Sequence, residues 1–565
     1  MEKIIPYLQQ FYLAKDIERI VSELERYART LPTVKPKYFT NTWYKNSNIY
    51  SVYPDGVSLH QEAPLTEIKD YLTTIRKLGC NAIHLLPFLK SPMQDKGYDV
   101  SDYYSVREGL GGMESLKALK KAAEEQEIHI FMDLIFNHVS IEHEWFMKAE
   151  QGSEYYRNFF LHTKETPQFL RKIEKDSTVY AEYLVNGEKT LVSVAFPEFA
   201  GELPHWRQGK DGYWYYHTYY PHQIDLNWQN PDVFIELSKI LLFWASKGFN
   251  FRFDAIQFIG KTAYKHLDTH NPFTHHLTSV FNVIAESVFP ECIFIFETFE
   301  HLDSVIEYFG TANNQQSKLL YSFHFTASLW ISLLEENQSH IWKQLKSMSD
   351  IPIHAQWVNF LRNHDELSLA YVDKTILEKV HTKLIDSGKP FRSEFGISGR
   401  TYSLLASDEK RFLMSYFLLS SMPGSIMIPY GDEFGMGNIA QSQLSEEEKK
   451  DTRNINRGVV TTEIIKSKKG ELLFAHLATI FKKRQIFRDY LNIWPEELPV
   501  AQGIFGATYK KGTSEFLIFI NLTPARKTVH FDDIAAYAKI LEINNVDIEN
   551  NNIKLDTYAG IWLQK

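Results

Sequence analysis

The stretch F-N-F-R-F-D-A-I-Q-F, residues 249–258, alternates apolar residues with Asn250, Arg252 and Asp254. This is the period of a β-strand, so the three polar side chains share one face. An arginine and an aspartate two positions apart on that face can touch, and the positive charge would lower the carboxyl pKa and keep Asp254 ionised. Two interpretations are open from this stretch alone: a carboxylate nucleophile, or a structural ion pair inside a barrel.

Outward from this stretch, short apolar segments alternate with amphipathic ones. Helices are predicted near 65–78 and 114–125, and strands at 48–53, 82–86, 129–134, 251–254, 293–297, 319–323, 357–361 and 425–429. Strands that alternate with helices pair in parallel, and eight of them close as an α/β fold, the (β/α)8 TIM barrel. Asp133, Asp254, Glu297 and residues 363–365 fall where strands end, which is the catalytic face of such a barrel.

Chain length and composition indicate how many domains to expect. The 565 residues, 44% of them hydrophobic, predict two or three domains with a large core. We expect a helical N-terminal extension over 1–44, the barrel over 45–490 and a C-terminal all-β sandwich domain over 491–565. The barrel would carry an inserted subdomain after its third strand, about 139–222, and a second insertion, about 366–407. The first of these contains the aromatic run at 214–220.

Charge and cysteine content exclude some classes of partner and compartment. The net charge of -9, without a basic tail, argues against a nucleic-acid partner. Cys80 and Cys292 lie in apolar runs, which predicts two reduced thiols rather than a disulfide. No secretion signal or membrane-spanning apolar run is found, so we expect a cytoplasmic protein that has no membrane partner.

Six short motifs stand in a recognisable order. They are G-Y-D-V-S-D-Y (97–103), D-L-I-F-N-H (133–138), Q-I-D-L-N (223–227), R-F-D-A (252–255), Glu297 after I-F-I-F, and N-H-D (363–365). Over about 45–490 the chain resembles the α-amylase superfamily of retaining α-glycoside enzymes, glycoside hydrolase family 13. The resemblance implies Asp254 as nucleophile, Glu297 as acid/base and Asp365 as the third carboxylate, which stabilises the transition state.

The resemblance also implies residues that bind sugar. His138 and His364 match two histidines that bind hydroxyl groups, and Arg252 lies beside the nucleophile. Glu297, in contrast, is flanked by Phe294, Phe296 and Phe299, and these different surroundings would raise the pKa of Glu297 and set its different role.

Two further segments bear on the substrate. Q-D-K-G-Y (94–98) resembles a loop of amylosucrases and sucrose phosphorylases in which Asp95 would reach the far end of the first sugar and Tyr98 would stack on its ring. D-T-R-N-I-N-R (451–457) resembles the loop whose arginine closes that pocket, with Arg457 as first choice and Arg453 as second. A closed pocket predicts action on one terminal α-glucosyl unit of a small-molecule α-glucoside.

The reaction itself stays open at this point. F-L-R-N-H-D-E-L (360–367) looks more like trehalose synthases and α-glucosidases, so the branch of the superfamily is undecided. Hydrolysis and transglucosylation share a covalent glucosyl-enzyme with phosphorolysis, which is the alternative, and an inactive sugar-binding barrel is an alternative of another class. Calcium is common in α-amylases, and Asn137 matches one ligand, but the other ligands cannot be placed. We therefore predict no metal and no cofactor, with calcium as the alternative; the oligomeric state is left open.

Overall fold

The computed structural model describes residues 1–35, 42–175, 178–194, 205–261, 271–369, 374–391 and 396–565. Eight parallel strands form a closed barrel, as predicted, and each strand neighbours the next barrel strand along the chain. The barrel strands are β1 (Asn48–Val52), β3 (Ala82–Leu85), β6 (His129–Leu134), β15 (Asn250–Phe253), β16 (Phe294–Phe296), β19 (Leu319–Tyr321), β20 (Gln356–Phe360) and β24 (Ser425–Pro429).

Helices connect the barrel strands, and one follows the last of them. They include α3 (Pro64–Leu78), α4 (Gly112–Glu125), α7 (Pro231–Ala245), α8 (Pro272–Glu286), α10 (Phe323–Glu335), α14 (Glu409–Ser420) and α16 (Lys468–Lys483). Helix α3 begins with proline and ends at Gly79, whose φ of 98° is a conformation that glycine adopts readily. Helix α16 ends at Lys483, where the chain tightens into the 3-10 helix η9 (Arg484–Tyr490).

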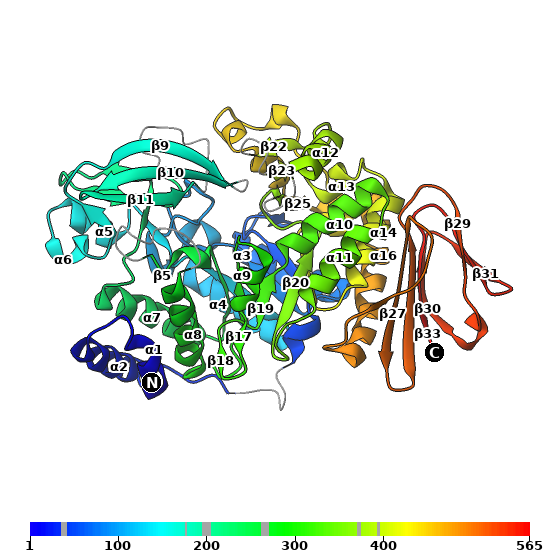
Figure 1. The fold of residues 1–565 in the computed structure, drawn as a ribbon, viewed down its shortest axis with the longest axis horizontal. Coiled ribbons are helices and arrows are strands. Elements are labelled where there is room, and N and C mark those ends of the chain that lie inside the picture. Colours follow the sequence, from blue (N-terminus) through cyan, green and yellow to red (C-terminus); the bar gives the residue numbers. More distant parts are fainter. Residues whose placement is uncertain (36–41, 176–177, 195–204, 262–270, 370–373, 392–395) are drawn as a thin grey trace. The chain divides into compact units, whose positions relative to one another are not determined.

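The chain divides into two compact units. The first comprises residues 1–41, 84–118 and 129–321. After β6 it carries the antiparallel sheet of β9 (Gln168–Lys175), β10 (Thr178–Val185) and β11 (Glu188–Ser193), drawn in cyan in Figure 1. Residues of this sheet share a small core with Leu161, Trp206 and Tyr216. The predicted subdomain after the third strand therefore exists, and we propose 139–222 as its bounds.

The second unit comprises residues 42–83, 119–128 and 322–565. Its C-terminal part, orange to red in Figure 1, contains two antiparallel sheets. One includes the long strands β27 (Ile504–Lys511) and β28 (Ser514–Asn521), and the other includes β29 (Lys527–His530). Both sheets contribute to one apolar core that contains Leu517, Phe519 and Val529. Two sheets with a shared core form a sandwich, and we propose 491–565 as this domain.

Candidate active site

One guanidinium joins the two carboxyl groups that are predicted to do the chemistry. Arg252, on β15, is fully buried; its Nη1 lies 2.7 Å from Oδ1 of Asp254, and its Nη2 pairs with Oε1 of Glu297. Asp254 and Glu297 directly follow β15 and β16, which pair in parallel with Phe253 opposite Phe296. The equal ends of adjacent parallel strands thus bring the two side chains to the same guanidinium.

The backbone beside Asp254 adopts an unusual conformation. Ala255 has a φ of 46°, in the left-handed region that a residue with a Cβ rarely occupies. Its N–H points to Oε2 of Glu297 at 3.4 Å. A strained non-glycine residue persists only where its surroundings hold it, and such residues cluster at active sites.

The electrostatics of this pair differ from the prediction. Burial raises the pKa of the Asp254 carboxyl, and the positive charge of Arg252 opposes that rise without cancelling it. Arg252 thus lowers the Asp254 pKa, as predicted, but it does not offset burial in full. The predicted contrast in surroundings is wrong, because Glu297 contacts Arg252 while the rings of Phe294 and Phe296 pack on Phe253, at centroid distances of 5.0 and 5.3 Å.

Arg252 also contacts a series of linked polar groups for which the sequence predicted no role. Asp133 accepts from Arg252 Nη1 at 2.7 Å through Oδ1, and its Oδ2 lies 3.0 Å from Nε2 of His84. The hydroxyl of Tyr321 lies 3.3 Å from Nδ1 of the same histidine. His84 and Tyr321 sit in apolar strands, and a lone polar side chain in such a strand is the signal that could have found them.

Three residues of the first unit, from three separate segments, meet near the carboxylates. Nε2 of His138 lies 3.0 Å from the carbonyl oxygen of Tyr98, and the ring of Tyr219 packs edge-on against His138 at 5.7 Å. The negative charges of Asp254 and Glu297 add to burial in raising the pKa of Tyr219 well above its usual value. The structure thus brings His138 and Tyr98 together and adds Tyr219 from the aromatic run; sugar binding by His138 and Tyr98 stays a prediction.

Asp95 lies in a loop that is folded around another carboxylate. Asp99 accepts hydrogen bonds from Ser91 Oγ at 2.7 Å and from the N–H of Gln94 at 2.9 Å. Oδ2 of Asp95 accepts from Nε2 of Gln223 at 2.9 Å. Gln223 belongs to the Q-I-D-L-N motif, so this motif and the Q-D-K-G-Y loop are in contact. The pairing of Asp95 with a late arginine stays a prediction.

In the second unit, Asp365 is contacted by two arginines and a histidine. Oδ1 of Asp365 lies 3.0 Å from Nη1 of Arg453 and 3.7 Å from Nη2 of Arg457, and Oδ2 lies 3.0 Å from Nε2 of His364. Burial would raise the Asp365 pKa, but His364 and the arginines outweigh it and hold the pKa well below its usual range. Arg453, the second choice, makes the shorter contact. Asp451 accepts from its Nε and Nη2 at 2.8 to 3.1 Å, and from Nη1 of Arg457 at 3.3 Å.

Asn137, which matches a calcium ligand of α-amylases, faces a lysine. Oδ1 of Asn137 accepts a hydrogen bond from Nζ of Lys261 at 2.5 Å. No group of three or more His, Cys, Asp or Glu side chains in the described ranges is arranged to hold a metal ion.

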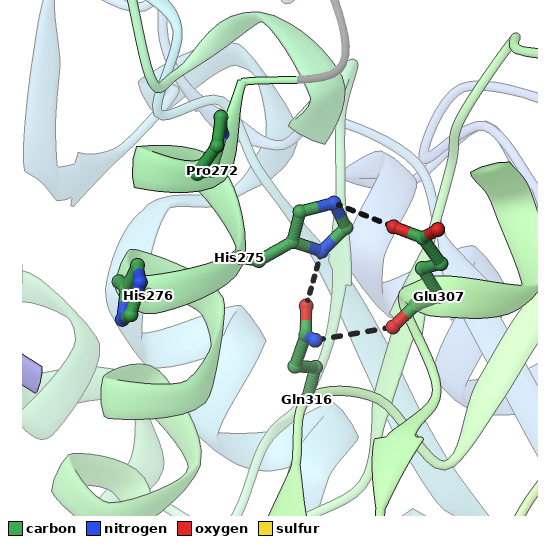
Figure 2. Close-up of a pocket in the computed structure, with 5 residues that line it drawn as sticks. All are labelled: Pro272, His275, His276, Glu307 and Gln316. Atoms are coloured by element: carbon green, nitrogen blue, oxygen red, sulfur yellow. Dashed lines mark hydrogen bonds and ion pairs between the residues drawn. The ribbon is translucent and has the colours of Figure 1, made fainter.

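A separate pocket of about 320 Å³ is lined by Pro272, His275, His276, Glu307 and Gln316. Figure 2 shows three of its polar residues turned toward one another, with His276 apart from them: Nδ1 of His275 lies 2.9 Å from Oε1 of Gln316, whose Nε2 donates to the Glu307 carbonyl at 3.1 Å. None of the predicted site residues lines this pocket.

Comparison with known proteins decides the family. The model of the alpha amylase catalytic domain matches residues 35–385, which is more than half of the chain. The chain belongs to the alpha-amylase family. This confirms the resemblance drawn from the six motifs. No helix in the described part of this alpha-amylase family member combines the length and apolar character that a membrane crossing requires.

The individual relatives share less than a third of their aligned residues with this chain. The chain is 29% identical to the trehalose synthase of Thermus thermophilus over 412 residues, which is 70% of this chain and 39% of that protein. It is 28% identical to the glucan 1,6-alpha-glucosidase of Streptococcus dysgalactiae subsp. equisimilis over 420 residues, 72% of this chain and 67% of that protein. The chain thus spans less than two thirds of the length of the Thermus enzyme.

Solved structures agree on the fold. The trehalulose synthase from Pseudomonas mesoacidophila MX-45 superposes with a TM-score of 0.71 at 16% identity, over 92% of this chain and 99% of that one. At this identity the likeness supports the fold alone.

Proposed function

We propose that this alpha-amylase family member is a retaining enzyme that acts on a terminal α-glucosyl unit of small α-glucosides. The observation that carries the proposal is the contact of one guanidinium, that of Arg252, with both Asp254 and Glu297. Two carboxyl groups on one guanidinium are compatible with the separation of roughly 5 Å that retaining catalysis needs. The relatedness to a trehalose synthase and a glucan 1,6-alpha-glucosidase supports the substrate class.

The proposed reaction has two steps. Asp254 attacks the anomeric carbon while protonated Glu297 gives its proton to the leaving oxygen, so one C–O bond forms as the glycosidic C–O bond breaks. Glu297, now ionised, takes a proton from water or a sugar hydroxyl, which attacks the same carbon and releases Asp254. Arg252 stabilises the negative charge that passes between the two carboxyl groups. Asp365 would stabilise the positive charge of the oxocarbenium-like transition state.

We assign the other residues to sugar binding. His138, Tyr98 and Asp95 would contact the first sugar, and we assign the same role to His364 and Arg457. Asp95 and Arg457 would limit the pocket to one glucosyl unit, which favours small substrates over long chains.

Product analysis tests the proposal. The purified protein is incubated with sucrose, trehalose, maltose and maltotriose, with and without phosphate, and the first-formed anomer is read by NMR. We expect an α-configured product, as free glucose or as a transferred glucosyl unit, and loss of turnover in Asp254→Asn with an unchanged melting temperature. A β-configured first product would overturn retention, and glucose 1-phosphate formed only with phosphate would replace hydrolysis or transfer by phosphorolysis.

A further inference from the structure

Lys261 is a buried lysine whose ammonium group contacts three oxygen atoms. Only 2% of the residue is exposed. Its Nζ lies 2.9 Å from Oδ2 of Asp225 and 2.5 Å from Oδ1 of Asn137, and it also donates to the carbonyl oxygen of Phe258. An ammonium has three protons, and here each has an acceptor.

The three acceptors are of the types that bind calcium: a carboxylate, a side-chain amide oxygen and a backbone carbonyl. The position among them is already taken by a positive charge that is neutralised by Asp225. A divalent cation at this point would meet the ammonium at contact distance, and it would need six to eight oxygens. These residues therefore do not fit a calcium ion.

The backbone is shaped to bring Lys261 to this place. Gly260 precedes it and donates to Oγ1 of Thr274 at 3.1 Å. A Cβ at position 260 would lie 2.2 Å from that oxygen, so any other residue would push this segment away from helix α8. A glycine is required here by close approach rather than by its φ.

The ammonium ties together three segments that carry candidate site residues. Asn137 precedes His138, and Phe258 lies in the 3-10 helix η4 (Ile256–Phe258) that follows Asp254 and Ala255. Asp225 ends β14 (Gln223–Asp225), which pairs antiparallel with β7 (His138–Ser140) so that Asp225 lies opposite His138.

Asp225 extends the tie to Tyr219. It accepts the N–H of Thr218 at 3.0 Å and the Thr218 hydroxyl at 2.5 Å. The ring of the next residue, Tyr219, packs edge-on against His138 and against Phe258, each at 5.7 Å. Loss of the ammonium would leave Asp225 and Asn137 buried without their common cation, and their segments would be free to shift.

We propose that Lys261 is a built-in cation that takes the place of an inorganic ion and positions His138 and Tyr219 beside Asp254. The positioning role rests on the proposed function, whereas the replacement of an ion does not. Lys261 itself touches none of the reacting groups, so it is a positioning residue.

The test compares the whole chain with Lys261→Met, which keeps most of the length of the side chain but removes its charge. Lys45→Met is the matched control, because Lys45 is also buried and donates to a carbonyl, that of Ile353, and to an amide oxygen, that of Asn492. We expect Lys261→Met to lower kcat/KM about ten- to a hundredfold, the usual effect of losing a supporting partner. Lys45→Met should lower the melting temperature and leave kcat/KM unchanged. Equal kcat/KM in wild type and Lys261→Met would overturn the positioning role.

A melting experiment tests whether Lys261 replaces an inorganic ion, and it requires no enzymatic turnover. Wild type should melt at the same temperature in EDTA and in calcium chloride, while Lys261→Ala, whose cavity exposes Asp225 and Asn137, should melt at a higher temperature in calcium chloride than in EDTA. A wild-type melting temperature that falls in EDTA, or a Lys261→Ala variant indifferent to calcium, would refute ion replacement. The wild-type arm needs no variant to fold, and a protein that turns over no α-glucoside would refute the proposed function while leaving this result valid.

Discussion

Arg252 donates to Asp254 across 2.7 Å, and the two residues are only two positions apart in the chain. The same guanidinium reaches Asp133 and Glu297, so it makes a fork with three carboxyl groups while it is fully buried. A fork of this kind depends on the planar geometry of arginine and not on its charge alone.

Arg252→Lys keeps the charge but cannot contact three carboxyl groups at once. We expect kcat/KM to fall on the order of a hundredfold, comparable to the loss of one preorganised donor in an active site. Arg171→Lys is the control, because Arg171 forms an exposed pair with Glu182 on β9 and β10. Steady-state kinetics of both variants check the prediction, and full activity in Arg252→Lys would contradict it.

The acid limb of the pH profile should reflect Asp254. A nucleophilic carboxylate must be ionised, so activity is lost as pH falls through its pKa, and burial raises that pKa. We expect the acid limb of kcat/KM to have an apparent pKa above the ordinary aspartate value of about 3.9. This apparent pKa belongs to the coupled pair of Asp254 and Glu297. Arg252→Gln should move it to still higher pH, because the opposing positive charge is gone. A limb at or below the ordinary value would contradict the assignment.

Arg453 should matter more than Arg457 for Asp365. The contact of Arg453 is 3.0 Å and that of Arg457 is 3.7 Å, and Asp451 holds the guanidinium of Arg453. A hydrogen bond to a charged group contributes about 1.5 to 3 kcal/mol, so Arg453→Gln should lower kcat/KM by at least about tenfold. Arg457→Gln should have a smaller effect. The reverse order would favour Arg457 as the residue that serves the sugar pocket.

Asp95 should decide the preference for chain length. Asp95→Ala removes a carboxylate that Gln223 orients at 2.9 Å. We expect weaker turnover of short α-glucosides and a relaxed preference for a terminal glucosyl unit, measured as relative kcat/KM for a maltooligosaccharide series. Gln223→Ala should act in the same direction with a smaller effect. An unchanged profile in Asp95→Ala would refute the closed pocket.

Glu433 should limit stability at neutral pH. It is buried and accepts from the hydroxyls of Tyr50 and Tyr71, and burial raises its pKa to about 7. A carboxyl whose folded pKa exceeds its unfolded pKa, about 4.3, costs stability progressively as pH rises between the two values. Glu433→Gln should therefore be more stable than wild type above pH 7, by on the order of 3 kcal/mol, with no gain near pH 4.

The control for Glu433 is Glu67, another buried glutamate with the opposite shift. Burial would raise the Glu67 pKa, but the N–H groups of Leu59, His60 and Glu62 that it accepts hold it below the usual value. Glu67→Gln should therefore lose stability at neutral pH, and that loss should shrink as pH falls. Denaturant unfolding of both variants across pH measures the two slopes, and equal slopes would contradict the assignments.

The sequence by itself determined the barrel and its alpha-amylase family. All eight barrel strands lie within two residues of their predicted bounds, because alternation and strand length are local properties that a chain displays in its residues. The contact between Arg252 and Asp254 was also predictable from the sequence, because residues two apart in a strand lie side by side on the same face.

Only the tertiary structure decided which groups share a partner. The sequence suggested an apolar environment for Glu297, because its neighbours in the chain are phenylalanines. In the structure, the Phe294 ring packs on Phe253, and the Glu297 carboxylate contacts Arg252 of the adjacent strand. The direction in which the Asp254 pKa shifts depends on burial from all sides, and no single strand reveals that burial. The contact of Lys261 with Asn137 joins residues 124 positions apart, and such a distance is closed by the fold rather than by any local pattern.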